Sequence, residues 1–320
     1  MLNVLITGGN GYVGRVLTRQ IMNEHNVCVV DNERYGELRF TQDDLSHFKF
    51  INADIRNRDK MTEVIENFSP DVIIHLAAVH YIPECESSPE FAVSTNIEGT
   101  INILSLCPKS CRFVFASSGA VYAPQETAHD EVESPTQPMD VYGFTKLHCE
   151  DYIRYFSQIR GFSSVIVRLF NVVGSGETNP HLLPEIFAQF QAGYKVLKLG
   201  NITPKRDYID VRDAARGFWA VSSCGDIPLG TVTTVNLGTM NQYSVSEILD
   251  KIREIGNLDF EIQQDPQRIR EVDRPFLLAN NHRIKELFGW APIFNINDSI
   301  QDLIQAPDLP QSLVNKYQLK

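Results

Sequence analysis

The hydrophobic positions of the chain fall into short unbroken runs, separated by longer stretches with helical spacing. An unbroken apolar run of about four to eight residues is typical of a buried strand in a parallel sheet. The runs lie at residues 2–7, 27–30, 48–51, 72–78, 111–116, 165–167 and 233–237. Strands that alternate with helices predict an α/β fold built on a doubly wound parallel sheet.

A glycine-rich loop follows the first of these runs directly. Residues 8–14 read GGNGYVG, and a helical pattern begins immediately after them. Glycines permit a tight turn and a close approach of the backbone to a pyrophosphate, and the helix N-terminus offers unpaired N–H groups to the phosphates. The predicted cofactor contacts in this loop are Gly8, Gly11, Tyr12, Val13 and Gly14.

An acidic residue, Asp31, ends the second predicted strand. A carboxylate at this distance from the glycine loop can accept hydrogen bonds from both hydroxyls of an adenosine ribose, and it would repel a 2′-phosphate. We therefore predict that the cofactor is NAD and not NADP, with Asn32 beside it. The alternative is that Asp31 and Asn32 only begin a turn.

Further cofactor contacts are predicted where later strands end, because ligands bind beyond the carboxyl ends of the strands in such sheets. Asp54 and Ile55 could bracket an adenine, and small residues after the fourth strand would let a ribose pass close to the backbone. The predicted contacts of this group are Asp54, Ile55, Leu76, Ala77, Ala78, Asn96 and Ser117.

The second half of the chain has a more mixed pattern, with one helix predicted over residues 212–222 and another after Ser244, an N-cap. We predict a Rossmann-type dinucleotide-binding domain at residues 1–170, to which a segment near 231–240 returns. Residues 171–320 are predicted to form mainly a smaller substrate domain. The two domains are therefore expected to be interleaved.

Tyr142 and Lys146 are the candidate catalytic pair. They lie four residues apart in a helical stretch, so they share one face of the helix. A neighbouring ammonium favours the phenolate form of a tyrosine, which makes Tyr142 a candidate general base. The same spacing also occurs by chance on many helices. The glycine loop, the Ser117-Ser118 pair after a hydrophobic run and the downstream Arg206-Asp-Tyr support the catalytic interpretation.

Taken together, these motifs resemble the extended short-chain dehydrogenase/reductase family. The resemblance is strongest to its NAD-dependent nucleotide-sugar epimerase/dehydratase group, whose best-known member is UDP-glucose 4-epimerase. The matching stretches are residues 7–14, 31–32, 54–55, 75–78, 117–122, 142–146, 168–171, 206–211, 235–239 and 270–273. The resemblance implies that NAD is the cofactor, that a nucleotide diphosphate sugar is the substrate and that the protein is a homodimer.

The resemblance also implies roles for individual residues. Tyr142 would be the base, Lys146 would contact the nicotinamide ribose and lower the pKa of Tyr142, and Ser118 would hydrogen-bond the reacting sugar oxygen. The implied or suspected substrate contacts are Asn171 and Arg206 at the diphosphate, Arg270 and Asp273 near the nucleoside, and His80 and His181 near the sugar. For His181, an ordinary surface loop histidine is the alternative.

One departure from the family pattern bears directly on the reaction. The dehydratases of the family carry Asp-Glu after the hydroxyl residue, where this chain has Gly119 and Ala120. We therefore expect epimerisation at C4 through a transient 4-keto sugar. The alternatives are a dehydrogenase, 4-keto reductase or decarboxylase of the same family, or a non-catalytic nucleotide-binding protein. A UDP-sugar is favoured, although residues 270–275 are also reminiscent of GDP-sugar enzymes.

Composition excludes several other classes. The formal net charge of −11, from 29 basic and 40 acidic residues, argues against binding to nucleic acid or an anionic membrane. No apolar run approaches the ~20 residues of a membrane span, and the N-terminus does not resemble a signal peptide. The six cysteines lack a metal-binding pattern, so we expect reduced thiols, no metal site and a cytoplasmic location.

Overall fold

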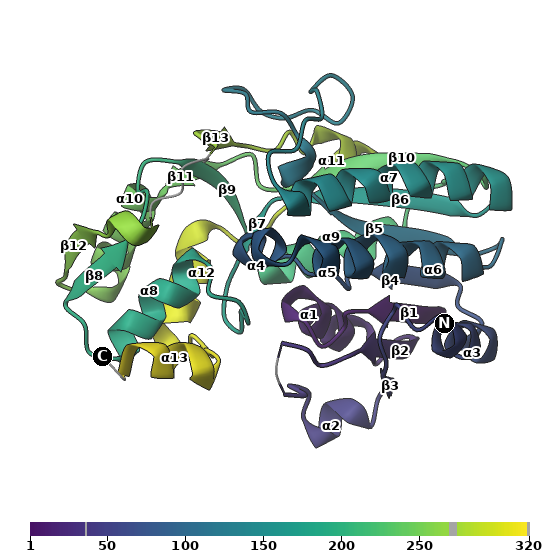
Figure 1. The fold of residues 1–320 in the computed structure, drawn as a ribbon, viewed down its shortest axis with the longest axis horizontal. Coiled ribbons are helices and arrows are strands. Elements are labelled where there is room, and N and C mark those ends of the chain that lie inside the picture. The colour runs from purple at the N-terminus through teal and green to yellow at the C-terminus, as the bar shows by residue number, and fades with distance from the viewer. Residues whose placement is uncertain (36, 269–273, 319–320) are drawn as a thin grey trace.

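A seven-stranded sheet forms the larger part of the structure, a computed structural model that describes residues 1–35, 37–268 and 274–318 (Figure 1). The strand order is β10-β6-β5-β4-β1-β2-β3, and every neighbouring pair is parallel. The strands are β1 (Asn3–Thr7), β2 (Asn26–Asp31), β3 (Lys49–Asn52), β4 (Val72–His75), β5 (Arg112–Ser118), β6 (Ser163–Leu169) and β10 (Val232–Leu237). The predicted α/β class, a doubly wound parallel sheet, is confirmed.

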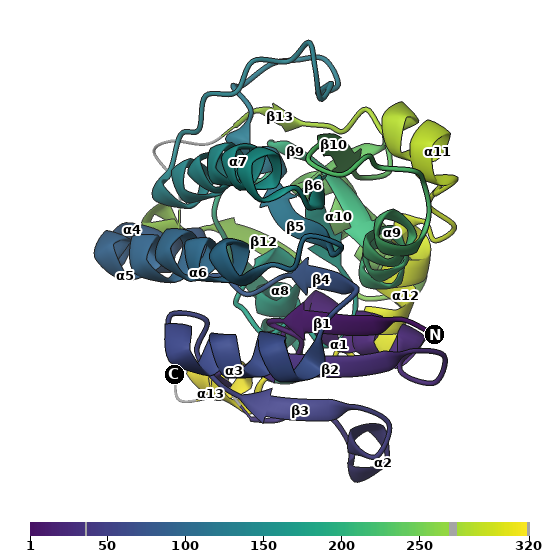
Figure 2. The same cartoon turned by 90° about the vertical axis from the view of Figure 1, so that its right-hand side faces the viewer.

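Helices cover both faces of this sheet, which explains why its central strands are mainly apolar. Successive side chains of a strand point to opposite faces, so Val4 and Ile6 enter one core and Leu5 enters the other. The first core contains α1 (Tyr12–Ile21), α9 (Val211–Ser223) and α11 (His282–Phe288). The second contains α3 (Arg58–Phe68), α6 (Gly99–Leu106) and α7 (Val141–Arg160). Figure 2 shows α9 and α11 on one side of the sheet and α6 and α7 on the other.

One predicted strand differs from the structure. The strand predicted at residues 72–78 ends at His75, because residues 76–78 leave the ladder and line a cavity described below.

The helical stretch before β5 is interrupted. It consists of α5 (Pro89–Val93), a π-helical turn at Ser94–Glu98 and α6. A π-helical turn accommodates extra backbone within a helix and often lies near a functional site.

A smaller part of the molecule is built from the second half of the chain. Its sheet contains β7 (Asn171–Val173), β9 (Lys205–Asp210), β11 (Gln242–Ser244) and β13 (Phe276–Leu277), and β8 (Val196–Leu199) pairs with β12 (Glu261–Gln264). The helices here are α8 (Leu182–Gln191), α10 (Val245–Gly256), α12 (Ile296–Gln305) and α13 (Gln311–Gln318). The capping box at Ser244 is confirmed, since its hydroxyl accepts from Glu247 N at 3.1 Å and its N–H donates to the Glu247 carboxylate at 2.7 Å.

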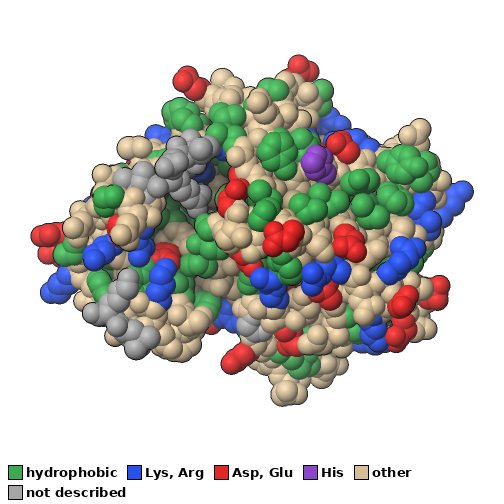
Figure 3. All heavy atoms as spheres, in the orientation of Figure 1, with side chains coloured by type: hydrophobic (Ala, Val, Ile, Leu, Met, Phe, Trp, Pro, Cys, Tyr) green, Lys and Arg blue, Asp and Glu red, His purple; other side chains and the backbone are tan. Residues whose placement is uncertain are grey.

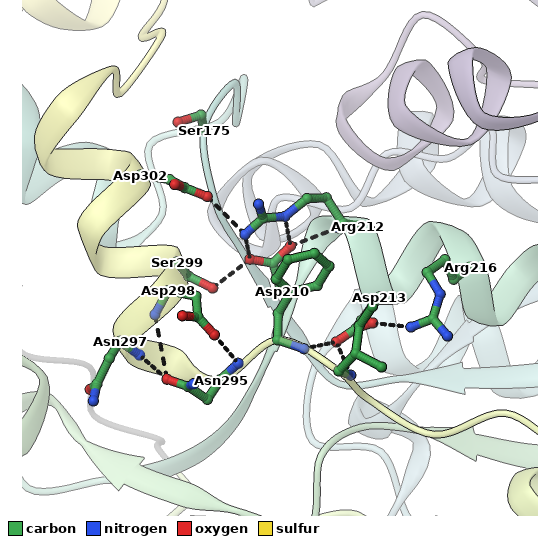
Figure 4. A network of polar contacts seen from close by, with 12 residues as sticks. Ser175, Asp210, Arg212, Asp213, Arg216, Asn295, Asn297, Asp298, Ser299 and Asp302 are labelled. Carbon is green, nitrogen blue, oxygen red and sulfur yellow. Dashed lines mark hydrogen bonds and ion pairs between the residues drawn. The ribbon is translucent and has the colours of Figure 1, made fainter.

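A polar network joins the two parts (Figure 4). The Asp210 carboxylate caps the N-terminus of α9, which packs on the large sheet. It also accepts from Ser299 Oγ of α12 at 2.7 Å and pairs with Arg212, which reaches Asp302 of α12 at 2.8 Å. Thus α9 and α11, in addition to the predicted returning strand, bring residues beyond 171 onto the large sheet.

The remaining short elements lie in connections between the larger ones. They are α2 (Gln42–Leu45), α4 (Ile82–Ser87) and the two 3₁₀ turns at Gly119–Val121 and Pro266–Arg268. The turn at Gly119–Val121 follows β5 directly and places Ser118 at the point where the strand leaves the sheet.

Candidate active site

A cavity of about 1110 Å³ lies between the carboxyl edge of the large sheet and the smaller part. Figure 3 shows the surface hollowed between these parts. Most of the predicted site residues line it, although they come from many elements. Those that line the cavity are Gly8, Gly11, Tyr12, Val13, Gly14, Asp31, Asn32, Ile55, Leu76, Ala77, Ala78, His80, Ser117, Ser118, Tyr142, Lys146, Asn171, His181 and Arg206.

The glycine loop has the geometry of a phosphate cradle. Gly8 has a φ of +73°, and a Cβ atom there would lie 2.6 Å from the backbone nitrogen of Ala77, so only glycine fits. Gly11 is the N-cap of α1 and offers no side chain to the first turn of the helix. The loop therefore exposes backbone N–H groups at a helix N-terminus to the cavity, as a dinucleotide pyrophosphate requires.

Asp31 lies at the end of β2, next to this loop. Its carboxylate accepts hydrogen bonds from Asn10 N at 3.0 Å and Glu33 N at 2.8 Å. Burial raises its pKa, although both backbone bonds act in the opposite direction. These bonds fix the carboxylate at the cavity wall, where a ribose would meet it.

Two predicted cofactor residues do not line the cavity. Asn96 is buried, and its amide clamps the backbone of Val79: Oδ1 accepts from Val79 N at 2.8 Å and Nδ2 donates to Val79 O at 2.9 Å. Asp54 is bonded to Arg56 at 2.7 Å and to Asn32, and Arg56 lowers its pKa to about 2. Both side chains therefore lie behind the cavity wall and stabilise the segments that form it.

Tyr142 and Lys146 lie on one face of the first turns of α7, as their spacing predicts. Burial raises the pKa of Tyr142, and a hydrogen bond with Ser118 acts in the opposite direction. Burial also lowers the pKa of Lys146 to about 8. Lys146 Nζ lies over the Phe115 ring, 4.7 Å from its centroid, and 5.7 Å from the Tyr142 centroid.

The Lys146 ammonium lies over the Tyr142 ring, and its predicted lowering of the Tyr142 pKa stays a prediction. Ser118 is the group that lowers this pKa.

Ser117 faces away from the chemistry. Its hydroxyl donates to Glu150 Oε1 at 2.6 Å, and Glu150 forms a buried bidentate pair with Arg168, with distances of 3.0 and 2.7 Å. Arg168 in turn lies over the Tyr122 ring. The side chain of Ser117 therefore fixes the end of β5 against α7. Of the two serines, Ser118 is the one whose hydroxyl hydrogen-bonds Tyr142.

At the end of the cavity that holds His80 and His181, the sequence predicted only some of the lining residues. His80 and His181 have ring centroids 5.8 Å apart, and burial lowers the pKa of His80 to about 4. Glu177 was not predicted, yet its buried carboxylate lies within 4.8 Å of both imidazoles. Asn179 donates to His80 Nε2 at 3.2 Å. Glu177 and Asn179, which the sequence did not predict, belong to the loop after β7. The density of polar residues in that loop was the only sequence feature that could have indicated a site there.

The diphosphate and nucleoside contacts are placed only in part. Asn171 of β7 and Arg206 of β9 line the same cavity, and Arg206 Nη1 donates to Arg274 O at 2.7 Å. The predicted nucleoside pair, Arg270 and Asp273, lies outside the described residues. The predicted substrate contacts that are described therefore meet the predicted cofactor contacts in one cavity.

The cysteines are free thiols, five of them buried and Cys224 exposed. No helix in the described parts of the chain has the length and apolarity needed to cross a membrane.

Known proteins resemble this chain in sequence and fold. The UDP-glucose 4-epimerase of Rhizobium meliloti (strain 1021) is 29% identical over 315 residues, which cover 92% of this chain and 93% of that protein. The GDP-6-deoxy-D-mannose reductase of Pseudomonas aeruginosa is 27% identical over 247 residues, 73% of this chain and 79% of that protein. The crystal structure of UDP-glucose 4-epimerase from Brucella ovis in complex with NAD superposes with a TM-score of 0.84 at 26% identity, covering 96% of this chain and 98% of the other.

The glycine cradle, the acid at the end of β2 and the Ser118–Tyr142–Lys146 group fit a bound NAD and its redox chemistry. Residues 4–238 match the family described as the NAD dependent epimerase/dehydratase family. The chain, whose glycine loop and Tyr142–Lys146 pair line one cavity, belongs to the NAD-dependent epimerase/dehydratase family.

Proposed function

We propose that the protein is an NAD-dependent nucleotide-sugar epimerase that inverts C4 of a hexose through a transient 4-keto sugar. The observation that carries this proposal is the convergence of Ser118, Tyr142 and Lys146 on the cavity that the glycine loop also lines. A hydroxyl, a phenol and an ammonium placed beside a dinucleotide site suit the removal and return of a proton on a sugar oxygen.

Each residue has a distinct part in the proposed reaction. Bound NAD supplies a reversible acceptor for the C4 hydride. Tyr142 takes the proton of the C4 hydroxyl and later returns it to the oxygen. Ser118 hydrogen-bonds the same oxygen and lowers the pKa of Tyr142. Because burial raises that pKa, we expect turnover to rise with pH as the base form of Tyr142 becomes more populated.

The turn after Ser118 favours epimerisation over dehydration. A 4,6-dehydratase must move protons at C5 and C6, and each transfer needs a titratable side chain within reach. Gly119 and Ala120 cannot supply one. A Cβ at Gly119 would already lie 3.3 Å from the Phe170 ring, so the site leaves little room for a carboxylate there. His80 is the residue that could take over such a transfer from across the cavity.

The choice of sugar nucleotide is a separate part of the proposal. We favour a UDP-sugar, with Asn171 and Arg206 at its diphosphate, Arg270 and Asp273 near the nucleoside, and His80 and His181 near the sugar. The resemblance to UDP-glucose 4-epimerases supports this choice. The resemblance to a GDP-6-deoxy-D-mannose reductase supports the second candidate, reduction of a 4-keto GDP-sugar.

The proposed setting is the cytoplasm, and the proposed assembly is a homodimer. The cytoplasmic setting is supported by the free cysteines, and the homodimer by the family resemblance. Residues 1–170, with the returning segment near 231–240, are proposed to bind NAD, and residues 171–320 mainly to bind the nucleotide sugar.

The test is a screen of UDP-, GDP-, dTDP- and CDP-hexoses by thermal shift, followed by proton NMR of the products formed with NAD. We expect one nucleotide to stabilise the protein most and its hexose to be converted to the C4 epimer. Methyl signals of a 6-deoxy sugar would contradict the exclusion of dehydration. Absence of turnover with every nucleotide that binds would favour the non-catalytic alternative.

A further inference from the structure

Arg274 is a buried arginine whose side chain reaches across to the turn that follows Ser118. Its guanidinium donates to Tyr122 O at 2.6 Å, to Ala120 O at 2.7 Å and to Gly119 O at 3.4 Å. Its exposed fraction is 8%. Residues more than 150 positions apart are therefore joined by three hydrogen bonds, all of them to the backbone of one short turn.

This turn sets the position of the Ser118 hydroxyl. Ser118 Oγ accepts from Ala120 N at 3.1 Å, so the hydroxyl and the turn move together. On its other side the turn lies against α7, since a Cβ atom at Gly143 would be 2.7 Å from Ala120 O. Gly143 directly follows Tyr142. Arg274 thus holds the turn, and with it Ser118, beside the helix turn that carries Tyr142.

The backbone of Arg274 is tied to the substrate side of the cavity. Its carbonyl accepts from Arg206 Nη1 at 2.7 Å, and Phe276 and Leu277 of β13 pair with Lys205 and Arg206 of β9. One stretch of chain therefore contacts both the arginine proposed for the diphosphate and the turn of the reactive hydroxyl.

The charge of Arg274 indicates that its contact with residues 119–122 does more than stabilise the loop. No carboxylate of the described residues forms an ion pair with it. Burial and Arg206 lower its pKa, and the Asp140 carboxylate acts in the opposite direction. A buried guanidinium without a directly paired carboxylate is costly, and the hydrogen bonds to backbone carbonyls of the turn help to offset that cost. Arginine supplies several donors in a fixed planar geometry, which can hold three carbonyls of a turn at once.

We propose that Arg274 is a positioning residue for the reaction: it holds residues 119–122 so that the Ser118 hydroxyl meets both Tyr142 and the substrate oxygen. This inference rests on the proposed epimerase function. Arg274 also lines the cavity, and in this proposal it acts on the reaction through the turn.

The test compares Arg274→Ala and Arg274→Lys with Arg112→Ala in the NAD-loaded enzyme. Arg112 is the matched control because it also donates to backbone carbonyls, at 2.6 Å to Cys224 O and 2.8 Å to Gly225 O, but from the opposite end of β5. We expect both Arg274 variants to lose on the order of 10- to 100-fold in kcat, as misplaced groups do, with KM changed less than about threefold. Arg112→Ala should keep kcat.

The pH profile separates positioning from general destabilisation. Tyr142 is faced by Ser118, Cys85, Asp140 and Lys146, and of these Ser118 lowers its pKa. If the turn loosens, that effect weakens, so the midpoint at which kcat rises with pH should shift to higher pH. Arg274→Lys keeps the positive charge, and a similar shift in it would attribute the effect to geometry.

Two further measurements complete the test. Hydrogen–deuterium exchange of peptides covering residues 118–122 should accelerate in both Arg274 variants and not in Arg112→Ala, and guanidinium ion should restore part of the kcat of Arg274→Ala. An inactive wild-type enzyme would refute the proposed epimerase function. The hydrogen–deuterium exchange measurement would still test whether Arg274 holds residues 118–122 in place. Unchanged kcat, or a lower kcat with an unshifted pH midpoint and unchanged exchange, would overturn the proposal.

Discussion

The Lys146 ammonium lies over the ring of Tyr142, 5.7 Å from its centroid. Helix α7 brings the two side chains together, because residues four apart lie on the same face of a helix. The ammonium also lies over the Phe115 ring, and burial lowers its pKa to about 8. The pair is therefore a cation against aromatic faces, and Ser118 is the neighbour that makes the phenol more acidic.

Tyr142→Phe should remove most of the turnover and leave NAD binding nearly intact. Loss of a general base costs about 10²- to 10⁴-fold, whereas the phenylalanine ring retains the packing of the tyrosine ring. The test measures kcat of the variant and, separately, its affinity for NAD by fluorescence titration. Tyr194→Phe, which removes a hydroxyl bonded to Tyr317 O, is the control and should retain activity. Activity of Tyr142→Phe within a few-fold of wild type would show that another group is the base.

Asp31 should make the protein prefer NAD over NADP. Its carboxylate is fixed at the cavity wall by Asn10 N and Glu33 N, and a 2′-phosphate there would meet a negative charge. We expect the two dissociation constants, measured by calorimetry, to differ by at least about tenfold, and Asp31→Ala to narrow that gap. Tighter binding of NADP by the unaltered protein would refute the assignment.

The exposed face of α7 should form the proposed homodimer. Phe144, Tyr152, Tyr155 and Ile159 are 48, 40, 58 and 56% exposed, and Figure 3 shows hydrophobic side chains gathered over α6 and α7. Burial of such apolar area favours association. Light scattering at micromolar concentration should give the mass of a dimer, and Tyr155→Glu with Ile159→Glu should give a monomer. Leu229→Glu, at an exposed site elsewhere, is the control; a monomeric wild type would exclude the assembly.

His129→Phe should stabilise the protein, most of all in mild acid. The imidazole is fully buried against Tyr122, with ring centroids 4.6 Å apart, and neither ring nitrogen has a hydrogen-bond partner within the described part of the chain. Burial lowers the pKa of His129 to about 4. An unfolded histidine takes up its proton below about pH 6.5. Between these values the unfolded state binds more protons, so the wild type loses stability as the pH falls.

Urea denaturation at pH 7.5 and pH 5 tests this prediction. The His129→Phe variant lacks both the unsatisfied ring nitrogens and the titrating group. Its gain in unfolding free energy over the wild type should therefore be larger at pH 5 than at pH 7.5, by on the order of 1 kcal/mol. His47→Gln, at an exposed position, should show no such difference between the two pH values. An equal gain at both pH values would mean that His129 does not titrate as stated.

The sequence by itself determined the features that depend on neighbouring residues. Buried parallel strands appear as apolar runs, and the helix period places Tyr142 and Lys146 on one face, because both patterns follow from backbone geometry. The glycine loop was readable because the steric need at Gly8 shows as the residue type itself. Asp31 could be identified from its distance along the chain from that loop.

The tertiary structure decided the features that depend on distant contacts and on burial. Arg274 meets the turn after Ser118 across more than 150 residues, and Glu177 meets His80 across the cavity. Neither pairing has a local pattern, because side chains on loops are placed by the packing of whole elements. Asn96, predicted as a cofactor contact, clamps the backbone of Val79, and burial and Ser118 act in opposite directions on the pKa of Tyr142. Desolvation is a property of the surrounding fold, which no spacing along the chain encodes.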